Sequence, residues 1–101
     1  MKETFGEYIR KLRTEEGLTL TQLAAKLELD SANLSKIETG KRDFSMERLE
    51  MLAKVFNLDL EILKNEYKSD KLAKHIYDLD CSSEVLKVAE EKAEYRKTLK
   101  K

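Results

Sequence analysis

A short run of small polar residues, with one long cation, stands out between positions 31 and 36. Its members are Ser31, Ala32, Asn33, Ser35 and Lys36. If the run is helical, Leu34 and Ile37 point inward, and the small polar residues lie outside or near the N-terminal end of the helix. A solvated helix usually carries more Glu and Lys on its outer face. This face instead lets another surface approach closely, within reach of hydroxyl, amide and ammonium groups.

Other arrangements that support chemistry are absent from the sequence. It contains no Ser-His-Asp set, no glycine-rich phosphate loop and no pair of carboxylates with an identifiable pocket. The single cysteine, Cys81, and the single histidine, His75, do not make a set of zinc ligands, so we expect both to be structural. We therefore expect neither an enzyme nor a metal site, and no cofactor.

Two repeats of one pattern position the polar run. Each repeat is a leucine, a capping residue and a second leucine four positions after the cap. The repeats are Leu18, Thr19 and Leu23, and then Leu29, Asp30 and Leu34. This spacing predicts a helix N-cap flanked by a hydrophobic staple, and Gln22 can complete a capping box with Thr19. Two helices this close must cross steeply, which is the helix-turn-helix geometry.

These residues resemble the phage-repressor (Cro/C1, XRE) family of helix-turn-helix proteins. The resemblance rests on Leu23-Ala24, on Leu34-Ser35-Lys36-Ile37-Glu38 and on Gly40-Lys41, and it extends from about Phe5 to Leu63. It implies an all-α fold, with a five-helix repressor-like DNA-binding bundle and about two further C-terminal helices. Apolar residues at helical spacing and the absence of proline also favour an all-α protein. A generic small helical bundle is the alternative.

The chain divides into two expected parts. Residues 1–66 form the helix-turn-helix DNA-binding domain, and residues 67–101 form a C-terminal helical extension. We expect helices at about 4–15, 20–27, 31–39 and, after a cap at Ser45, to Phe56, followed by a short helix after Asp59. Tyr67 to Asp70 is expected to be a connection, with helices at 71–79 and from Ser83 to Tyr95 or further.

The resemblance implies that the helix at 31–39 enters the major groove of double-stranded DNA, where each base pair shows a distinct pattern of donors and acceptors. Ser31, Ala32 and Lys36 match the base-facing positions of the family, and Asn33 lies beside them within reach of a base or a phosphate. Lys36 can donate to guanine O6 and N7, and Ala32 can touch a thymine methyl group. A simple phosphate contact is the alternative for Lys36.

Phosphate contacts are expected on both sides of that helix. Backbone N–H groups at the start of a helix are natural anion sites, and Thr19 and Thr21 lie at one such start. Thr39, Lys41 and Arg42 match a second phosphate cluster of the family.

The family also pairs a glutamate with an arginine of the first helix, which here implies a partly buried, bidentate pair of Glu38 with Arg13. An ordinary solvated glutamate is the alternative. Three positions depart from the family pattern. Glu28 stands where Gly is usual, which predicts a strained or shifted turn; Leu20 replaces a phosphate-binding Gln, and Phe44 replaces a common Pro.

The charge balance argues against a strong generic affinity for DNA. The chain has 20 Lys or Arg and 20 Asp or Glu, and positions 1–64 hold 11 of the basic and 12 of the acidic residues. Non-specific binding should then be weak, with the basic residues gathered on one face. The family binds as two-fold dimers on near-palindromic operators with half-sites one helical turn (~34 Å) apart. We therefore expect a homodimer.

The C-terminal helices carry more apolar positions than a free tail needs. They either pack back onto the N-terminal bundle or form a dimer interface, and we favour the dimer interface. No apolar run approaches membrane length, and one cysteine suits a reducing compartment, so we expect a cytoplasmic protein without membrane contact. The expected function is a sequence-specific transcriptional regulator, most often a repressor. The alternative is an antitoxin-like or adaptor module that binds another protein.

Overall fold

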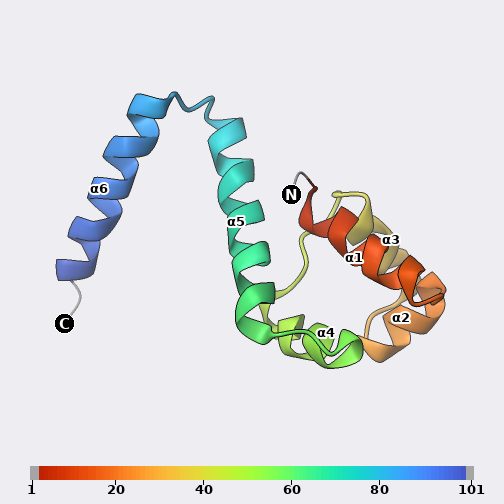
Figure 1. Ribbon diagram of the computed structural model, residues 1–101. Coiled ribbons are helices and arrows are strands. Elements are labelled where there is room, and N and C mark those ends of the chain that lie inside the picture. The colour runs from red at the N-terminus through yellow and green to blue at the C-terminus, as the bar shows by residue number, and fades with distance from the viewer. Residues whose placement is uncertain (1–2, 100–101) are drawn as a thin grey trace. The chain divides into compact units, whose positions relative to one another are not determined.

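The computed structural model describes residues 3–99, and all their regular secondary structure is helical (Figure 1). The α-helices are α1 (Phe5–Glu15), α2 (Leu20–Lys26), α3 (Ser31–Glu38), α4 (Leu49–Phe56), α5 (Leu60–Asp78) and α6 (Ser83–Leu99). A 3₁₀ turn, η1 (Met46–Arg48), leads into α4. The expected all-α fold is confirmed for these residues. Residues 1–2 and 100–101, where the two expected parts begin and end, lie outside the described residues.

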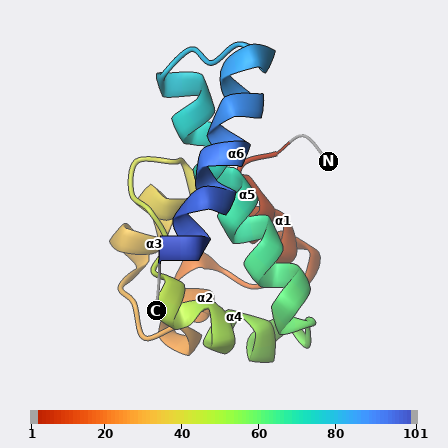
Figure 2. The same ribbon diagram turned by 90° about the vertical axis from the view of Figure 1, so that its left-hand side faces the viewer.

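The chain forms two compact units, Met1–Asp70 and Lys71–Lys101. The first contains α1 to α4 and the beginning of α5, and the second contains the rest of α5 and α6. Both views show α5 as one continuous helix that belongs to both units (Figures 1 and 2).

The connection expected at Tyr67–Asp70 was wrong, because α5 runs through these residues. Tyr67 is buried in the first unit, and its hydroxyl donates to the backbone oxygen of Phe44 at 2.7 Å. The polar residues after Tyr67 lie on the exposed or half-exposed sides of the same helix. They include neither Gly nor Pro, the residues that most often end a helix.

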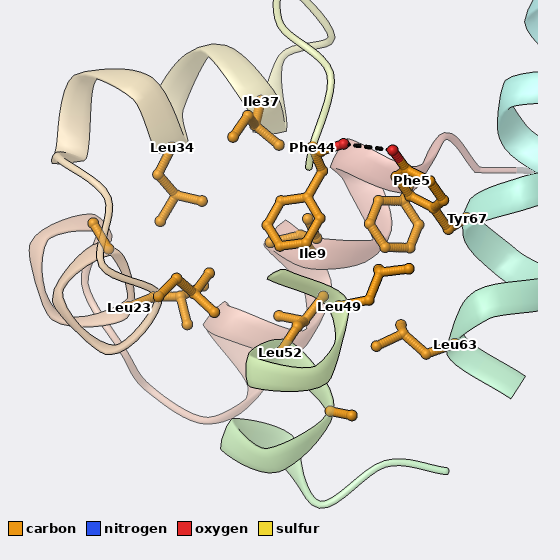
Figure 3. Close-up of a cluster of buried hydrophobic side chains, with 13 residues drawn as sticks. Phe5, Ile9, Leu23, Leu34, Ile37, Phe44, Leu49, Leu52, Leu63 and Tyr67 are labelled. Carbon is orange, nitrogen blue, oxygen red and sulfur yellow. Dashed lines mark hydrogen bonds between the residues drawn. The ribbon is translucent and has the colours of Figure 1, made fainter. Parts of the chain in front are cut away.

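The core of the first unit gathers apolar side chains from all five of its α-helices and from the loop before η1 (Figure 3). Phe5 lies among aromatic neighbours, with ring centroids 5.8 Å from Phe44 and 5.3 Å from Tyr67. The Phe5–Tyr67 contact is edge-on, an arrangement that aromatic pairs favour. From α3, Leu34 and Ile37 enter this core, so they fix which side of α3 faces inward.

The predicted helix starts at Thr19 and Asp30 are confirmed. The Gln22 N–H donates to Thr19 Oγ1 at 3.1 Å, and the Thr19 N–H donates to the Gln22 side chain at 2.9 Å. Asp30 accepts from the Asn33 N–H at 2.7 Å. Ser45, expected to cap the fourth helix directly, accepts from the Glu47 N–H within η1, so that α4 begins only at Leu49.

A close approach of two backbones sets the position of α3 against α1. A Cβ atom at Gly6 would overlap the carbonyl oxygen of Ile37 and lie 2.9 Å from that of Glu38. Only glycine leaves room for such contact. The C-terminal end of α3 therefore rests directly on the first turn of α1.

Candidate nucleic-acid interface

The face of α3 that carries the small polar residues is directed away from the core. Ala32 and Lys36 are exposed, and Ser31 is partly exposed. Leu34 and Ile37, on the opposite side, are 0% and 5% exposed. The helix thus presents side chains of little bulk, and one cation, to any surface that approaches it.

The turn between α2 and α3 is held in a conformation that glycine would adopt more easily. Glu28 has φ 59°, in the left-handed region. This explains how the chain keeps the turn without the glycine usual in the resembling family, at a local cost of about 1 kcal/mol. The Leu29 N–H donates to the Ala24 oxygen at 2.8 Å, which closes the end of α2.

Arg48 holds the same turn from a distant part of the chain. Its Nε donates to the Leu27 oxygen at 2.9 Å, and its Nη2 donates to the Glu28 oxygen at 3.2 Å. A cation bonded to the last carbonyls of α2 satisfies them and complements the negative end of the helix dipole. Sequence reasoning missed this residue, because no local pattern links positions 20 apart.

Arg13 and Glu38 form a bidentate pair at the C-terminal end of α3. Arg13 Nε lies 2.7 Å from Glu38 Oε2, and Nη2 donates to Oε1 at 3.0 Å. The hydrogen bond to Glu38 raises the pKa of Arg13, with the Coulomb attraction adding to it and burial opposing it. Nη1 also donates to the Leu18 oxygen at 3.0 Å, so one guanidinium joins α1, α3 and the residue before the α2 cap.

Asn33 is engaged on both sides within the protein. Its Oδ1 accepts from Arg42 Nη1 at 2.8 Å, and its Nδ2 donates to Asp30 Oδ2 at 3.2 Å. Asn33 therefore ties the loop after α3 to the beginning of α3. A base contact by Asn33 would require one of these bonds to be exchanged.

The residues expected to contact phosphate lie at two places. Thr19 and Thr21 are both exposed at the start of α2, where the Thr19 hydroxyl serves as the cap. Thr39 is exposed, and its hydroxyl donates to the Ser35 oxygen at 3.0 Å and the Lys36 oxygen at 3.2 Å.

The structure brings three cations together at the C-terminal end of α3. The backbone N–H groups of Lys41 and Arg42 both donate to the Lys36 oxygen, at 2.8 and 3.2 Å. All three side chains are exposed. This cluster of Lys36, Lys41 and Arg42 gives a nearly neutral unit a local positive surface beside the small face of α3.

Two other classes of site were searched for in residues 3–99. This part of the chain holds no group of three or more His, Cys, Asp or Glu side chains placed to bind a metal ion. Its helices also include none that is both long and apolar enough to cross a lipid bilayer.

Comparison with known proteins gives a consistent result. The family model described as Helix-turn-helix matches residues 9–63. The chain is 50% identical over 40 residues to the HTH-type transcriptional repressor RghR of Bacillus subtilis (strain 168), which is 40% of this chain and 30% of that protein. It therefore spans less than a third of the length of RghR.

Two further likenesses cover nearly all of the related protein. The control protein C.MunI of a Mycoplasma species is 32% identical over 71 residues, 69% of this chain and 96% of C.MunI. The crystal structure of SinR, the master regulator for biofilm formation, in complex with DNA matches with a TM-score of 0.52 and 30% identity. That match covers 59% of this chain and 97% of SinR.

These likenesses agree with the capped helix pair, the buried Arg13–Glu38 bridge and the absence of an expected catalytic set. The match spans the five α-helices that form the core of the first unit, up to Leu63 in α5. The chain belongs to the helix-turn-helix family of the Cro/C1 (XRE) type, a family of DNA-binding transcriptional regulators rather than enzymes.

Proposed function

We propose that this chain is a sequence-specific transcriptional repressor that binds a near-palindromic operator as a homodimer, with α3 of each copy in the major groove. The observation that carries the proposal is the outward placement of the small face of α3, with Lys36 exposed on it. A major groove about 12 Å wide admits a helix only when its leading face is not bulky.

The attachment of α3 supports this role because a reading helix must be held rigidly. Its inner side chains are fully buried, its C-terminal end rests on Gly6, and Glu38 is fixed by Arg13. Side chains on such a helix lose little further freedom when they bind. Lys36 is assigned to guanine O6 and N7, and Ala32 to a thymine methyl group.

Phosphate contacts would set the register of α3 in the groove. The capping box of α2 uses the N–H groups of Thr19 and Gln22, and we assign those of Leu20 and Thr21 to a phosphate oxygen. Lys41 and Arg42 are assigned to a second phosphate beyond the other end of α3. Two such sets in a dimer would compensate for the low charge of one copy.

The experiment selects bound duplexes from a random pool and then measures affinity at several salt concentrations. We expect a near-palindrome, and Lys36→Ala should relax one base position per half-site by about 1–3 kcal/mol. Lys41→Ala should weaken binding to all sequences alike and lower the salt slope by about one unit. Lys54→Ala, an exposed position of α4, is the matched control and should change neither.

Binding that ignores salt, or no binding at low salt, would contradict the proposal, since contacts to phosphate must release counterions. That outcome would favour the alternative, an antitoxin-like or adaptor module whose partner is another protein. The neutral charge balance is the one observation on the side of that alternative.

A further inference from the structure

The helix α6 carries a row of apolar side chains that is not covered within residues 3–99. None of the residues 83–99 is buried, and Val85, Val88, Tyr95 and Leu99 are 50%, 40%, 63% and 61% exposed. Together with Lys92 they alternate spacings of three and four, which places them on the single seam of a coiled coil. A solitary helix of this length is marginal in water, so the row needs a partner surface.

The row also has the relief of a packing surface. A hollow of about 320 Å³ lies along it, lined by Glu84, Val85, Val88, Ala89 and Lys92. Side chains that leave holes between them receive the knobs of a facing helix. A single lysine on such a seam fixes register and the number of helices, at some loss of stability.

The charges of α6 are separated along its length. Residues 83–91 hold three acidic residues and one basic residue, and residues 92–99 hold three basic residues and one acidic residue. The first half therefore has a net charge of −2, and the second half has a net charge of +2. The residues that make this difference are Glu84, Glu90 and Glu91 against Lys92, Arg96 and Lys97.

The helix dipole accounts for only part of this separation. It favours Glu84 in the first turn and Arg96 and Lys97 in the last, but its effect falls off beyond a single turn. Glu90, Glu91 and Lys92 lie at the middle of α6, where the dipole gives no reason for the change of sign. A facing helix with the opposite order of charges does give one.

We propose that α6 pairs antiparallel with α6 of a second copy of this chain, so that the acidic half of each helix faces the basic half of the other. The charge order of α6 is complementary to itself only in this orientation, because a parallel pair in register would place acid on acid and base on base. The pairing is isologous, as a two-fold dimer requires. It deepens the homodimer of the proposed function, on which it rests, but it does not depend on DNA binding.

The first experiment measures the dimer dissociation constant of the full chain by sedimentation. A basic variant carries Glu84→Lys, Glu90→Lys and Glu91→Lys, and an acidic variant carries Lys92→Glu, Arg96→Glu and Lys97→Glu. Lys and Glu have similar helix propensity, so α6 keeps its intrinsic preference. Each variant alone should dimerise at least about tenfold more weakly than the original chain, and a mixture of the two should dimerise as well as it.

The second experiment determines the orientation, in a Cys81→Ser background that removes the native thiol. Ser83→Cys and Thr98→Cys lie near opposite ends of α6. Under oxidising conditions we expect a disulfide between the two variants when they are mixed, and none within either variant alone. Disulfides within each variant alone would overturn the antiparallel orientation.

Three further results would overturn the proposal. They are a monomeric original chain, charge variants that dimerise like the original, and a mixture that stays monomeric. A monomer whose α6 amides are protected from exchange would show that the helix folds back on its own chain. These readouts use no DNA, so a dimer that fails to bind any duplex would contradict the proposed function alone.

Discussion

Glu38 shows how one buried carboxylate can fix the end of a reading helix. Glu38 is 7% exposed and shares two hydrogen bonds with the guanidinium of Arg13. Removing one partner of a buried pair leaves the other charge without compensation, which usually costs more than the pair itself contributes. The pair therefore matters for folding although it would touch no base.

We expect Glu38→Ala to lower the free energy of unfolding by about 3 kcal/mol, because Arg13 would stay partly buried without a counter-charge. Urea denaturation followed by circular dichroism measures this loss. Glu50→Ala, at an exposed position of α4, is the control and should change stability by less than about 0.5 kcal/mol. Equal effects of the two substitutions would contradict a buried pair.

At this scale the sequence was informative where a contact is local. The caps at Thr19 and Asp30 could be predicted because their partners lie three residues away. The position of Arg13 beside Glu38 came from a family resemblance, and no pattern in the chain itself links them. The bonds that Arg48 makes to the α2–α3 turn could not be predicted, because a surface arginine reads the same with or without such a partner.

Among the elements, the crossing of α1 and α3 depends on the absence of a side chain. Gly6 lies in the first turn of α1, where a Cβ would overlap a carbonyl oxygen of α3. An isolated glycine in a helical pattern looks like a weak point of that helix. The sequence gives no sign that a second backbone occupies the space.

Gly6→Ala should lower the free energy of unfolding by about 1–3 kcal/mol, since α1 and α3 must separate to admit the methyl group. The chain offers a matched control in Gly17, where φ is 73° and no atom lies within 4 Å of an added Cβ. Gly17→Ala should cost about 1 kcal/mol from backbone strain alone and leave DNA affinity unchanged. Stabilisation by Gly6→Ala would contradict the close approach.

The continuity of α5 was missed for a related reason. Lys68, Ser69 and Asp70 form a polar run, and such a run is typical of a connection. Their place in a helix becomes evident only once Tyr67 is known to reach the Phe44 oxygen and to be buried. Secondary structure could be predicted wherever apolar spacing is dense, and it was lost where one long-range contact fixes the helix.

At the scale of the whole molecule, the two units differ in how they are stabilised. The first has a core that draws on five helices, whereas no residue of α6 is buried. The division between a self-sufficient unit and a dependent one follows from the distribution of apolar residues. What covers the dependent unit could not be read from a single chain, because the partner surface is not part of the pattern.

Heating the full chain over a hundredfold range of protein concentration should therefore give two transitions in far-ultraviolet circular dichroism. The melting of α6 should move to higher temperature with concentration, because pairing stabilises only the associated state. The unfolding of the first unit should stay where it is. A single transition that does not depend on concentration would mean that α6 is held by its own chain.

A helix without a core of its own has a consequence for how such a regulator counts itself. If α6 is ordered only in pairs, sparse molecules remain single and each grips one half of an operator. Occupancy of the whole operator then climbs about as the square of abundance, so a modest rise in synthesis crosses a threshold. The switch would need no small-molecule signal, only the number of copies in the cell.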